Sequence, residues 1–241
     1  MKKLSRRTVL LSGVATASVA TTAIGISVLA AKSEAKGLLR PPGALAEKDF
    51  LASCIKCGQC IQVCPYHSLK LLDLAQGIDM GTPVVDARER GCYLCDLFPC
   101  VLCCPSGALN PEVQKIEQVE MGVAWVHDPH RCWAYTKKTV PTTWLETLKQ
   151  HGNRTELEND LVEKLAPEAN QPCRLCEVVC PVPERDNAIR LEHGLPIVGP
   201  ACVGCGACEE VCPEGIIEIY SRKTFDELYR SSSKETSHHV E

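Results

Sequence analysis

Residues 54–65 read CIKCGQCIQVCP, and residues 202–213 read CVGCGACEEVCP. Both stretches space four cysteines as C-x2-C-x2-C-x3-C and follow the last one with proline. The 241-residue chain contains seventeen cysteines, and sixteen of them fall into four groups of four, each of which closes with Cys-Pro. The chemistry of these groups therefore decides how the chain folds.

The repeated spacing is the run that ligates cubane iron–sulfur clusters in bacterial ferredoxins. Four groups predict four [4Fe-4S] clusters and a path for electrons between them. Disulfides and zinc are the alternatives, because both also use grouped cysteines. The odd number of cysteines, the repeated proline and the length of the chain favour clusters over disulfides. Zinc is the stronger alternative, since it too needs four thiolates at a site.

The second group, CYLCDLFPCVLCCP at residues 92–105, offers two neighbouring cysteines for its last position. Proline follows Cys104, as it follows the last cysteine of the regular runs, so Cys104 is the predicted ligand. Cys103 is then predicted to be free and buried as a small hydrophobic residue. A swapped ligand or a redox role for Cys103 is the alternative.

The third group has only three consecutive cysteines, Cys173, Cys176 and Cys180. Cys132 lies 41 positions upstream of Cys173 and is predicted to loop back and complete the set. The intervening residues 133–172 form an insert with two predicted capping boxes, Thr143 to Glu146 and Thr155 to Glu158, and we expect a helical hairpin there. Two tryptophans in it suit either partner docking or packing.

The fourth cysteine of each run ligates the other cluster in two-cluster ferredoxins. The two regular runs resemble each other, and this resemblance predicts that the first group pairs with the fourth and the second with the third. The predicted cluster ligands are Cys54, Cys57, Cys60 and Cys212 (site 1); Cys202, Cys205, Cys208 and Cys64 (site 2); Cys92, Cys95, Cys100 and Cys180 (site 3); and Cys132, Cys173, Cys176 and Cys104 (site 4).

Aromatic residues make up only 5% of the chain, which is little for a conventional core. Metal–thiolate bonds can replace part of a core, because a site absent from the unfolded chain converts binding energy into folding energy. We predict an α+β fold, a duplicated bacterial two-[4Fe-4S] ferredoxin over residues 54–220, built from a unit of strand, cysteine loop, short helix and strand that occurs four times.

Local patterns place the smaller elements of this fold. A linker from residue 36 and a short helix over 45–53 precede the first group, and apolar spacing after Pro65 favours a helix. Strands are expected at 83–87 and 216–220, and a hairpin turns at His193-Gly194. The polar residues 221–241 are typical of a disordered tail.

The N-terminus carries an export signature. Lys2, Lys3, Arg6 and Arg7 precede an uncharged stretch from Thr8 to Ala31, which predicts a twin-arginine signal over residues 1–35. The twin-arginine translocase carries folded proteins, and clusters must be assembled in a reducing compartment. An ordinary membrane anchor is the alternative, and a retained leader would tether the protein to the membrane.

Without residues 1–32, 21 Lys and Arg stand against 30 Asp and Glu, a formal charge of −9. This acidity argues against nucleic-acid binding and predicts basic or neutral faces on redox partners. The sequence has no C-x-x-C-H haem motif and no nucleotide-binding glycine loop. No His, Asp and Ser constellation predicts a catalytic site, and the histidines are expected at surfaces or turns.

The chain resembles ferredoxin-type proteins of the MauM/NapG family. The resemblance rests on the twin-arginine start, LLRPPGA before the first group, CGQCIQVCPY, CYLCDLFPC, CPSGAL and the four Cys-Pro closures, which together span about residues 5–220. The long insert and Cys103 depart from the family pattern.

This resemblance implies a periplasmic iron–sulfur protein that takes electrons from a membrane quinol-oxidising iron–sulfur partner. It implies a periplasmic reductase, such as nitrate reductase, or a cytochrome c as acceptor. Two other functions remain open at this point. One is an iron–sulfur subunit of a molybdopterin oxidoreductase, and the other is an assembly factor for a periplasmic reductase.

Overall fold

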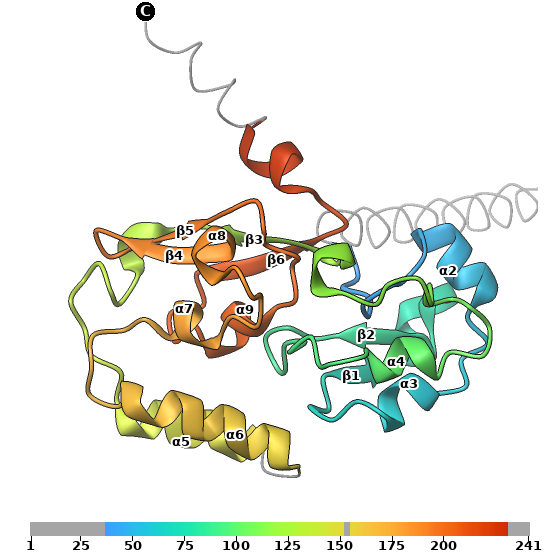
Figure 1. Cartoon of the computed structure of the whole chain (residues 1–241), viewed down its shortest axis with the longest axis horizontal. Coiled ribbons are helices and arrows are strands. Elements are labelled where there is room, and N and C mark those ends of the chain that lie inside the picture. The colour runs from blue at the N-terminus through green and yellow to red at the C-terminus, as the bar shows by residue number, and fades with distance from the viewer. Residues whose placement is uncertain (1–36, 152–154, 231–241) are drawn as a thin grey trace, which may run out of the picture. The chain divides into compact units, whose positions relative to one another are not determined.

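The computed structural model describes residues 37–151 and 155–230 as a set of short helices and strands (Figure 1). The predicted signal over residues 1–35 lies outside the described residues. The elements are α2 (Glu47–Ser53), α3 (Gln59–Gln62), β1 (Leu69–Leu71), β2 (Pro83–Val85), α4 (Pro99–Leu102), β3 (Gly122–Val126), α5 (Thr142–His151), α6 (Glu156–Leu165), α7 (Leu175–Val179), α8 (Arg185–Ala188), β4 (Ile189–Glu192), β5 (Leu195–Val198), α9 (Ala207–Val211) and β6 (Ile217–Ser221). Short 3-10 segments occupy Leu74–Asp79, which is kinked at Gly77, and Ile116–Gln118, Pro129–Arg131 and Ala166–Glu168. The arrangement is α+β.

The strands pair into three separate two-stranded antiparallel sheets, β1 with β2, β3 with β6, and β4 with β5. The predicted strand-loop-helix-strand unit does not recur four times. Directly after the second cysteine group, where the unit requires a strand, the chain forms an isolated bridge between Leu109 and Ala44. The cysteine loops therefore repeat along the chain, whereas the strands between them do not repeat in the same way.

The first lobe, residues 38–110, carries α2, α3, α4 and the β1–β2 sheet (Figure 1). The predicted linker before the first cysteine group is instead part of its core. Leu39 is buried, and the nearly inaccessible Arg40 donates to Thr82 Oγ1 over 2.8 Å and to the Pro83 carbonyl over 3.0 Å. Because a buried guanidinium needs acceptors for its donors, this segment is fixed in place.

The helix predicted after Pro65 is also wrong, because the chain forms strand β1 there. Leu69 pairs with Val85 of β2, and both side chains are buried. Leu74, just beyond β1, is 83% exposed. Apolar residues two apart match the strand period as well as the start of a helical one, so spacing alone was ambiguous.

The second lobe, residues 122–221, contains the other two sheets with α7 and α9 beside them (Figure 1). The predicted hairpin is confirmed, since β4 and β5 pair around His193 and Gly194, which have φ values of 52° and 81°. The predicted strand at 216–220 is confirmed as β6, whose Ile219 pairs with Ala124 of β3.

Two helices, α5 and α6, form in the insert. Thr155 caps α6, because its hydroxyl accepts from the Glu158 backbone N–H. Thr143 lies inside α5, which begins at Thr142, so the first predicted capping box is wrong. Trp144 donates to the Val211 carbonyl over 3.1 Å, so this tryptophan packs the insert onto the second lobe rather than facing a partner.

The start of the predicted disordered tail is instead ordered. After β6 the chain forms a helical turn at Asp226–Arg230, and Phe225, which precedes this turn, stacks on Tyr229 of the turn at 4.9 Å. Tyr229 also lies 5.0 Å from the Trp125 ring and donates to the Ala124 carbonyl. Aromatic burial orders residues 222–230, and the rest of the tail lies outside the described residues. Within the described residues, no helix has the length and apolarity needed to cross a membrane.

Candidate iron–sulfur sites

Four cysteines from the first and second groups surround one small cavity in the first lobe, which we call site A. They are Cys54, Cys57, Cys60 and Cys104. The first three lie around α3, whose N-cap is Gly58 in the left-handed conformation, a backbone shape that glycine adopts at little cost. Phe50 and Pro83 close the cavity from the lobe's core.

Cys104, and not Cys103, lines the cavity of site A. Burial raises the pKa of Cys104, but the N–H groups of Leu109, Ser106 and Ala108 with the Ser106 hydroxyl outweigh it and hold this pKa below its usual value. Hydrogen bonds of this kind stabilise a thiolate. Cys103 is half-buried and not buried as predicted, although its sulfur lies near Cys57 and Cys60.

A second set in the same lobe, site B, comprises Cys64, Cys92, Cys95 and Cys100. Burial raises the pKa of Cys95 to about 11 and that of Cys100 to about 12, and the neighbouring Cys64 thiol adds to both shifts. Cys100 and Cys95 in turn add to the raised pKa of the fully buried Cys92. Cys64 Sγ accepts from the Ser68 N–H over 3.3 Å.

The second lobe has the same organisation. Site C is a cavity lined by Cys132, Cys173, Cys176 and Cys212. Cys132 thus returns to the third group, as the sequence predicted. Trp133 and Leu175 cover the cavity, and Trp133 donates to the Glu214 carboxylate over 2.5 Å.

Site D comprises Cys180, Cys202, Cys205 and Cys208. Burial raises the pKa values of Cys205 and Cys208 strongly, and Cys180 and Cys202 both add to each shift. Cys202 Sγ accepts from the Ala124 N–H over 3.5 Å and from the N–H of Gly204. A glycine N–H therefore reaches a sulfur here, as the glycine-rich run suggests.

These sets correct the pairing predicted from the sequence. The first cysteine group exchanges its fourth cysteine with the second group, and the third group exchanges its fourth cysteine with the fourth group. Relative to the prediction, Cys104 and Cys212 change places, and so do Cys64 and Cys180. The prediction relied on the similarity of the two regular runs and did not consider how far apart the paired groups lie along the chain. Neighbouring groups close shorter loops, which costs less chain entropy.

The donor sets fit [4Fe-4S] clusters. All seventeen cysteines are free thiols in this structure. Among residues 37–151 and 155–230, no three His, Cys, Asp or Glu side chains converge where a single ion would sit. Four thiols are the set that such a cluster requires. In sites A and C they line a shared cavity, and in sites B and D they lie close enough to shift one another's pKa values. Burial keeps most of these thiols neutral without metal, so cluster binding must release protons.

The four sites follow one another in a fixed spatial order. Cys60 of site A adds to the raised pKa of Cys100 in site B, and Cys205 of site D does the same for Cys92 of site B. Cys176 of site C likewise acts on Cys208 of site D. Geometry gives the same neighbours, because the first two cysteine groups share sites A and B, the last two share sites C and D, and the Cys92 N–H donates to the Cys205 carbonyl over 2.8 Å. Among the described residues the order is A, B, D, C.

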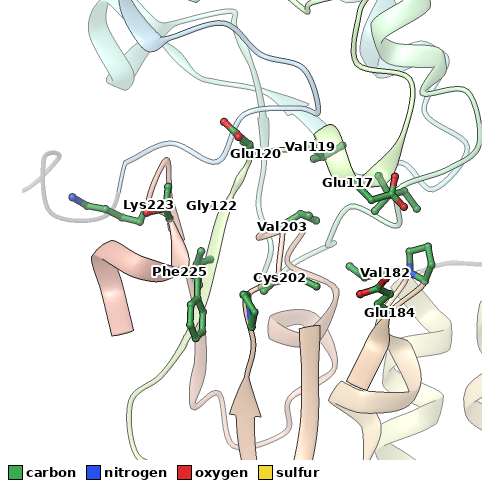
Figure 2. Close-up of a pocket in the computed structure, with 16 residues that line it drawn as sticks. Glu117, Val119, Glu120, Gly122, Val182, Glu184, Cys202, Val203, Lys223 and Phe225 are labelled. Carbon is green, nitrogen blue, oxygen red and sulfur yellow. The ribbon is translucent and has the colours of Figure 1, made fainter. Parts of the chain in front are cut away.

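One cavity of about 340 Å³ reaches a cysteine of site D from the surface (Figure 2). Cys202 and Val203 lie at its centre, between Phe225 on one side and Val182 on the other (Figure 2). The exposed carboxylates of Glu117, Glu120 and Glu184 line its mouth, which Lys223 also borders. The cavity is a route by which a small reagent can approach site D.

A buried polar network was not identified from the sequence. Glu210, within the fourth cysteine run, bonds to Arg90, Gly91 and Tyr93 around the second run. Arg90 Nη2 also lies 3.2 Å from the Glu158 carboxylate of the insert, which His67 contacts at 2.9 Å. The adjacent glutamates in CEEVCP could have indicated this network. A cysteine run that is buried around a cluster leaves little room for solvated carboxylates, so these carboxylates need buried partners.

Family comparisons agree with this geometry. A 4Fe-4S dicluster domain matches residues 53–108, which span the first two cysteine groups, and a 4Fe-4S binding domain matches residues 200–218. A dicluster domain over 53–108 independently supports the pairing of the first group with the second. No solved structure matches the chain significantly.

Curated relatives extend over most of the chain. The methylamine utilization ferredoxin-type protein MauM of Methylorubrum extorquens is 36% identical over 89% of this chain and 87% of its own length. MauM of Methylobacillus flagellatus is 36% identical over 92% of this chain and 82% of its own. The ferredoxin-type protein NapG of Escherichia coli is 35% identical over 80% of this chain and 74% of its own.

Proposed function

Since this chain belongs to the MauM/NapG family of ferredoxin-type proteins, we propose that it carries four [4Fe-4S] clusters and relays electrons from a membrane quinol-oxidising iron–sulfur partner to a periplasmic acceptor. An iron–sulfur electron-transfer protein of ferredoxin type needs donor and acceptor partners. The proposal concerns which partners these are, how many clusters lie between them, and where they meet.

The observation that carries the proposal is the row of four cysteine sets, A, B, D and C. Each bound cluster would supply a one-electron redox centre. Cys54, Cys57, Cys60 and Cys104 would hold the first of these centres, and Cys132, Cys173, Cys176 and Cys212 the last. An uninterrupted row with two ends suits a protein that takes electrons at one face and delivers them at another. In this proposal each lobe holds two clusters, so the protein is a duplicated two-cluster ferredoxin.

Compartment and partners form the second part of the proposal. Residues 1–35 act as a twin-arginine leader and place the protein in the periplasm, where a retained leader would tether it to the membrane. The acceptor is a periplasmic reductase or a cytochrome c, and the chain has no reaction of its own. The names of the relatives, which refer to methylamine utilization and to ferredoxin-type proteins, agree with a role in electron transfer.

Anaerobic purification followed by a redox titration under electron paramagnetic resonance (EPR) tests the proposal. We expect about sixteen irons per chain in four reducible cubanes, with potentials that a quinol can reach. Zinc or disulfides in place of iron would overturn it. Full iron content at potentials too low for any quinol would point instead to an assembly factor.

A further inference from the structure

The two lobes meet at a seam between the second and fourth cysteine runs. The Cys92 N–H donates to the Cys205 carbonyl over 2.8 Å, which joins a cysteine of site B directly to one of site D. Gly91 lies so close to α9 that a Cβ there would stand 2.6 Å from the Ala207 nitrogen. The backbones are in contact here, so only glycine fits at position 91.

One buried carboxylate bonds across this seam with both of its oxygens. Glu210 of α9 is 5% exposed. Its Oε2 accepts from the Gly91 N–H and from the Tyr93 hydroxyl, each over 2.7 Å, and its Oε1 accepts from Arg90 Nη1 over 3.0 Å. All three donors flank Cys92 in the other lobe. Bonds to a buried charged acceptor are among the stronger hydrogen bonds in proteins.

The neighbouring Glu209 provides a contrast within the same helix. It is 3% exposed, and its carboxylate accepts from the Ile219 N–H of β6, within the second lobe. Two adjacent glutamates are thus buried to a similar degree. The Ile219 bond of the Glu209 carboxylate lies within the second lobe, and it is the Glu209 backbone carbonyl that reaches Arg88, over 3.4 Å, whereas the Glu210 carboxylate bonds to three donors across the seam.

We propose that electrons cross between the lobes at the Cys92–Cys205 contact, and that Glu210 is the positioning residue that fixes the separation of sites B and D. This inference rests on the proposed electron-transfer function. The rate of electron transfer falls steeply as two redox centres move apart. Sites A and B share one lobe, as do C and D, and exchanged ligands hold each of those pairs together. Sites B and D share no cysteine run, so the step between them depends on contacts between the two lobes.

The substitution Glu210→Gln tests the role of the carboxylate. An amide presents one acceptor oxygen and one NH2 donor. Either Arg90 or the pair Gly91 and Tyr93 must then face a donor instead of an acceptor. Tyr93→Phe is the milder variant, since it removes one of the three bonds and preserves the ring. Glu209→Gln is the matched control.

The experiment measures magnetic dipolar interactions between clusters by pulsed EPR in the fully reduced, four-cluster protein, after iron has been counted in each variant. We expect Glu210→Gln to lose or broaden the B–D interaction, Tyr93→Phe to weaken it less, and Glu209→Gln to leave it as in the wild type. The A–B and C–D interactions should persist in all three variants and act as internal references.

Three unchanged interactions in Glu210→Gln, or in Tyr93→Phe if the first variant does not fold, would overturn the inference. Equal weakening of every interaction, or the same loss in Glu209→Gln, would also overturn it, because either result means a general loosening of the fold. A wild-type protein without four clusters would instead contradict the proposed function, so failure of the inference and failure of the proposed function are distinguishable.

Discussion

The guanidinium of Arg40 lies 4.8 Å above the ring of Phe50, which itself lines the cavity of site A. Arg40 is only 3% exposed and also bonds to Thr82, to the Pro83 carbonyl and to the carboxylates of Glu47 and Asp79. The segment before the first cysteine group therefore shapes a wall of the first cluster site.

Arg40→Met is expected to destabilise the protein by roughly 2–4 kcal/mol, because it removes the guanidinium donor from two buried acceptors and from the carboxylates of Asp79 and Glu47, of which Glu47 keeps Arg222. The denaturation midpoint of the cluster-loaded protein measures this. Arg190→Met is the control, since Arg190 pairs with Glu192 on the surface and should change stability by less than about 0.5 kcal/mol. Equal effects of the two substitutions would contradict the buried role of Arg40.

The carboxylate of Glu47 predicts a dependence of stability on pH. Partial burial raises its pKa, but hydrogen bonds and charge from Arg40, with Arg222, outweigh burial and hold the pKa below 4.5. A folded-state pKa below the unfolded one gives stability that is present above the unfolded pKa and lost as pH falls through the folded one.

Glu47→Gln should therefore lower the unfolding midpoint by a constant amount from pH 8 to pH 5, and the difference from wild type should shrink below about pH 4.5. Midpoints of both proteins across this range measure it. A difference that already shrinks between pH 8 and pH 6 would assign the effect to a histidine instead.

Iron content in double substitutions tests the pairing of the cysteine groups. Cys57 and Cys104 share site A, so Cys57→Ala with Cys104→Ala should lose no more iron than the more severe of the two single changes. Cys57→Ala with Cys212→Ala affects two sites and should lose about twice as much, leaving about eight of sixteen irons. The reverse order of these losses would restore the pairing predicted from the sequence.

Neighbouring cysteines in the second group should respond differently to substitution. Cys103→Ala is expected to keep the full iron content, because Cys103 does not line the cavity of site A. Cys104→Ala should lose iron from that site and leave the other three loaded. Iron and sulfide analysis of the two variants decides the matter, and iron loss in Cys103→Ala alone would exchange their roles.

Helix capping gives a matched pair of substitutions in the insert. The Thr155 hydroxyl accepts from the Glu158 N–H and donates to the Pro65 carbonyl over 2.8 Å. Thr155→Ala is expected to cost about 1–2 kcal/mol. Thr143 lies within α5, so Thr143→Ala should cost less than about 0.5 kcal/mol. Chemical denaturation distinguishes these values, and a larger effect at Thr143 would support the capping box predicted there.

Local signals in the sequence were enough for several elements. The turn at His193-Gly194 and strand β6 each depend on a short pattern that neighbouring residues do not override. Cys132 was found by elimination, since a four-thiol site left no other choice. These features need only the identity of a few residues and the number of ligands that a cluster requires.

Long-range features were missed because the local composition of a segment does not show which distant residues will contact it and bury it. Arg40, Pro41 and Pro42 look like a linker, yet they are buried by partners more than 35 positions away, such as Thr82. Glu210 looks like a solvated charge until the second cysteine run is placed against it. The pairing of the cysteine groups was missed for the same reason, since two similar motifs need not lie next to each other in the fold.

The pairing of adjacent groups also bears on how the protein is made. Every cysteine of sites A and B lies between Cys54 and Cys104, and every cysteine of sites C and D lies between Cys132 and Cys212. A nascent chain can thus offer two complete ligand sets while its C-terminal half is still on the ribosome. Ligand sets completed lobe by lobe would allow cluster insertion to begin during synthesis, which would shorten the time that buried thiols spend uncovered.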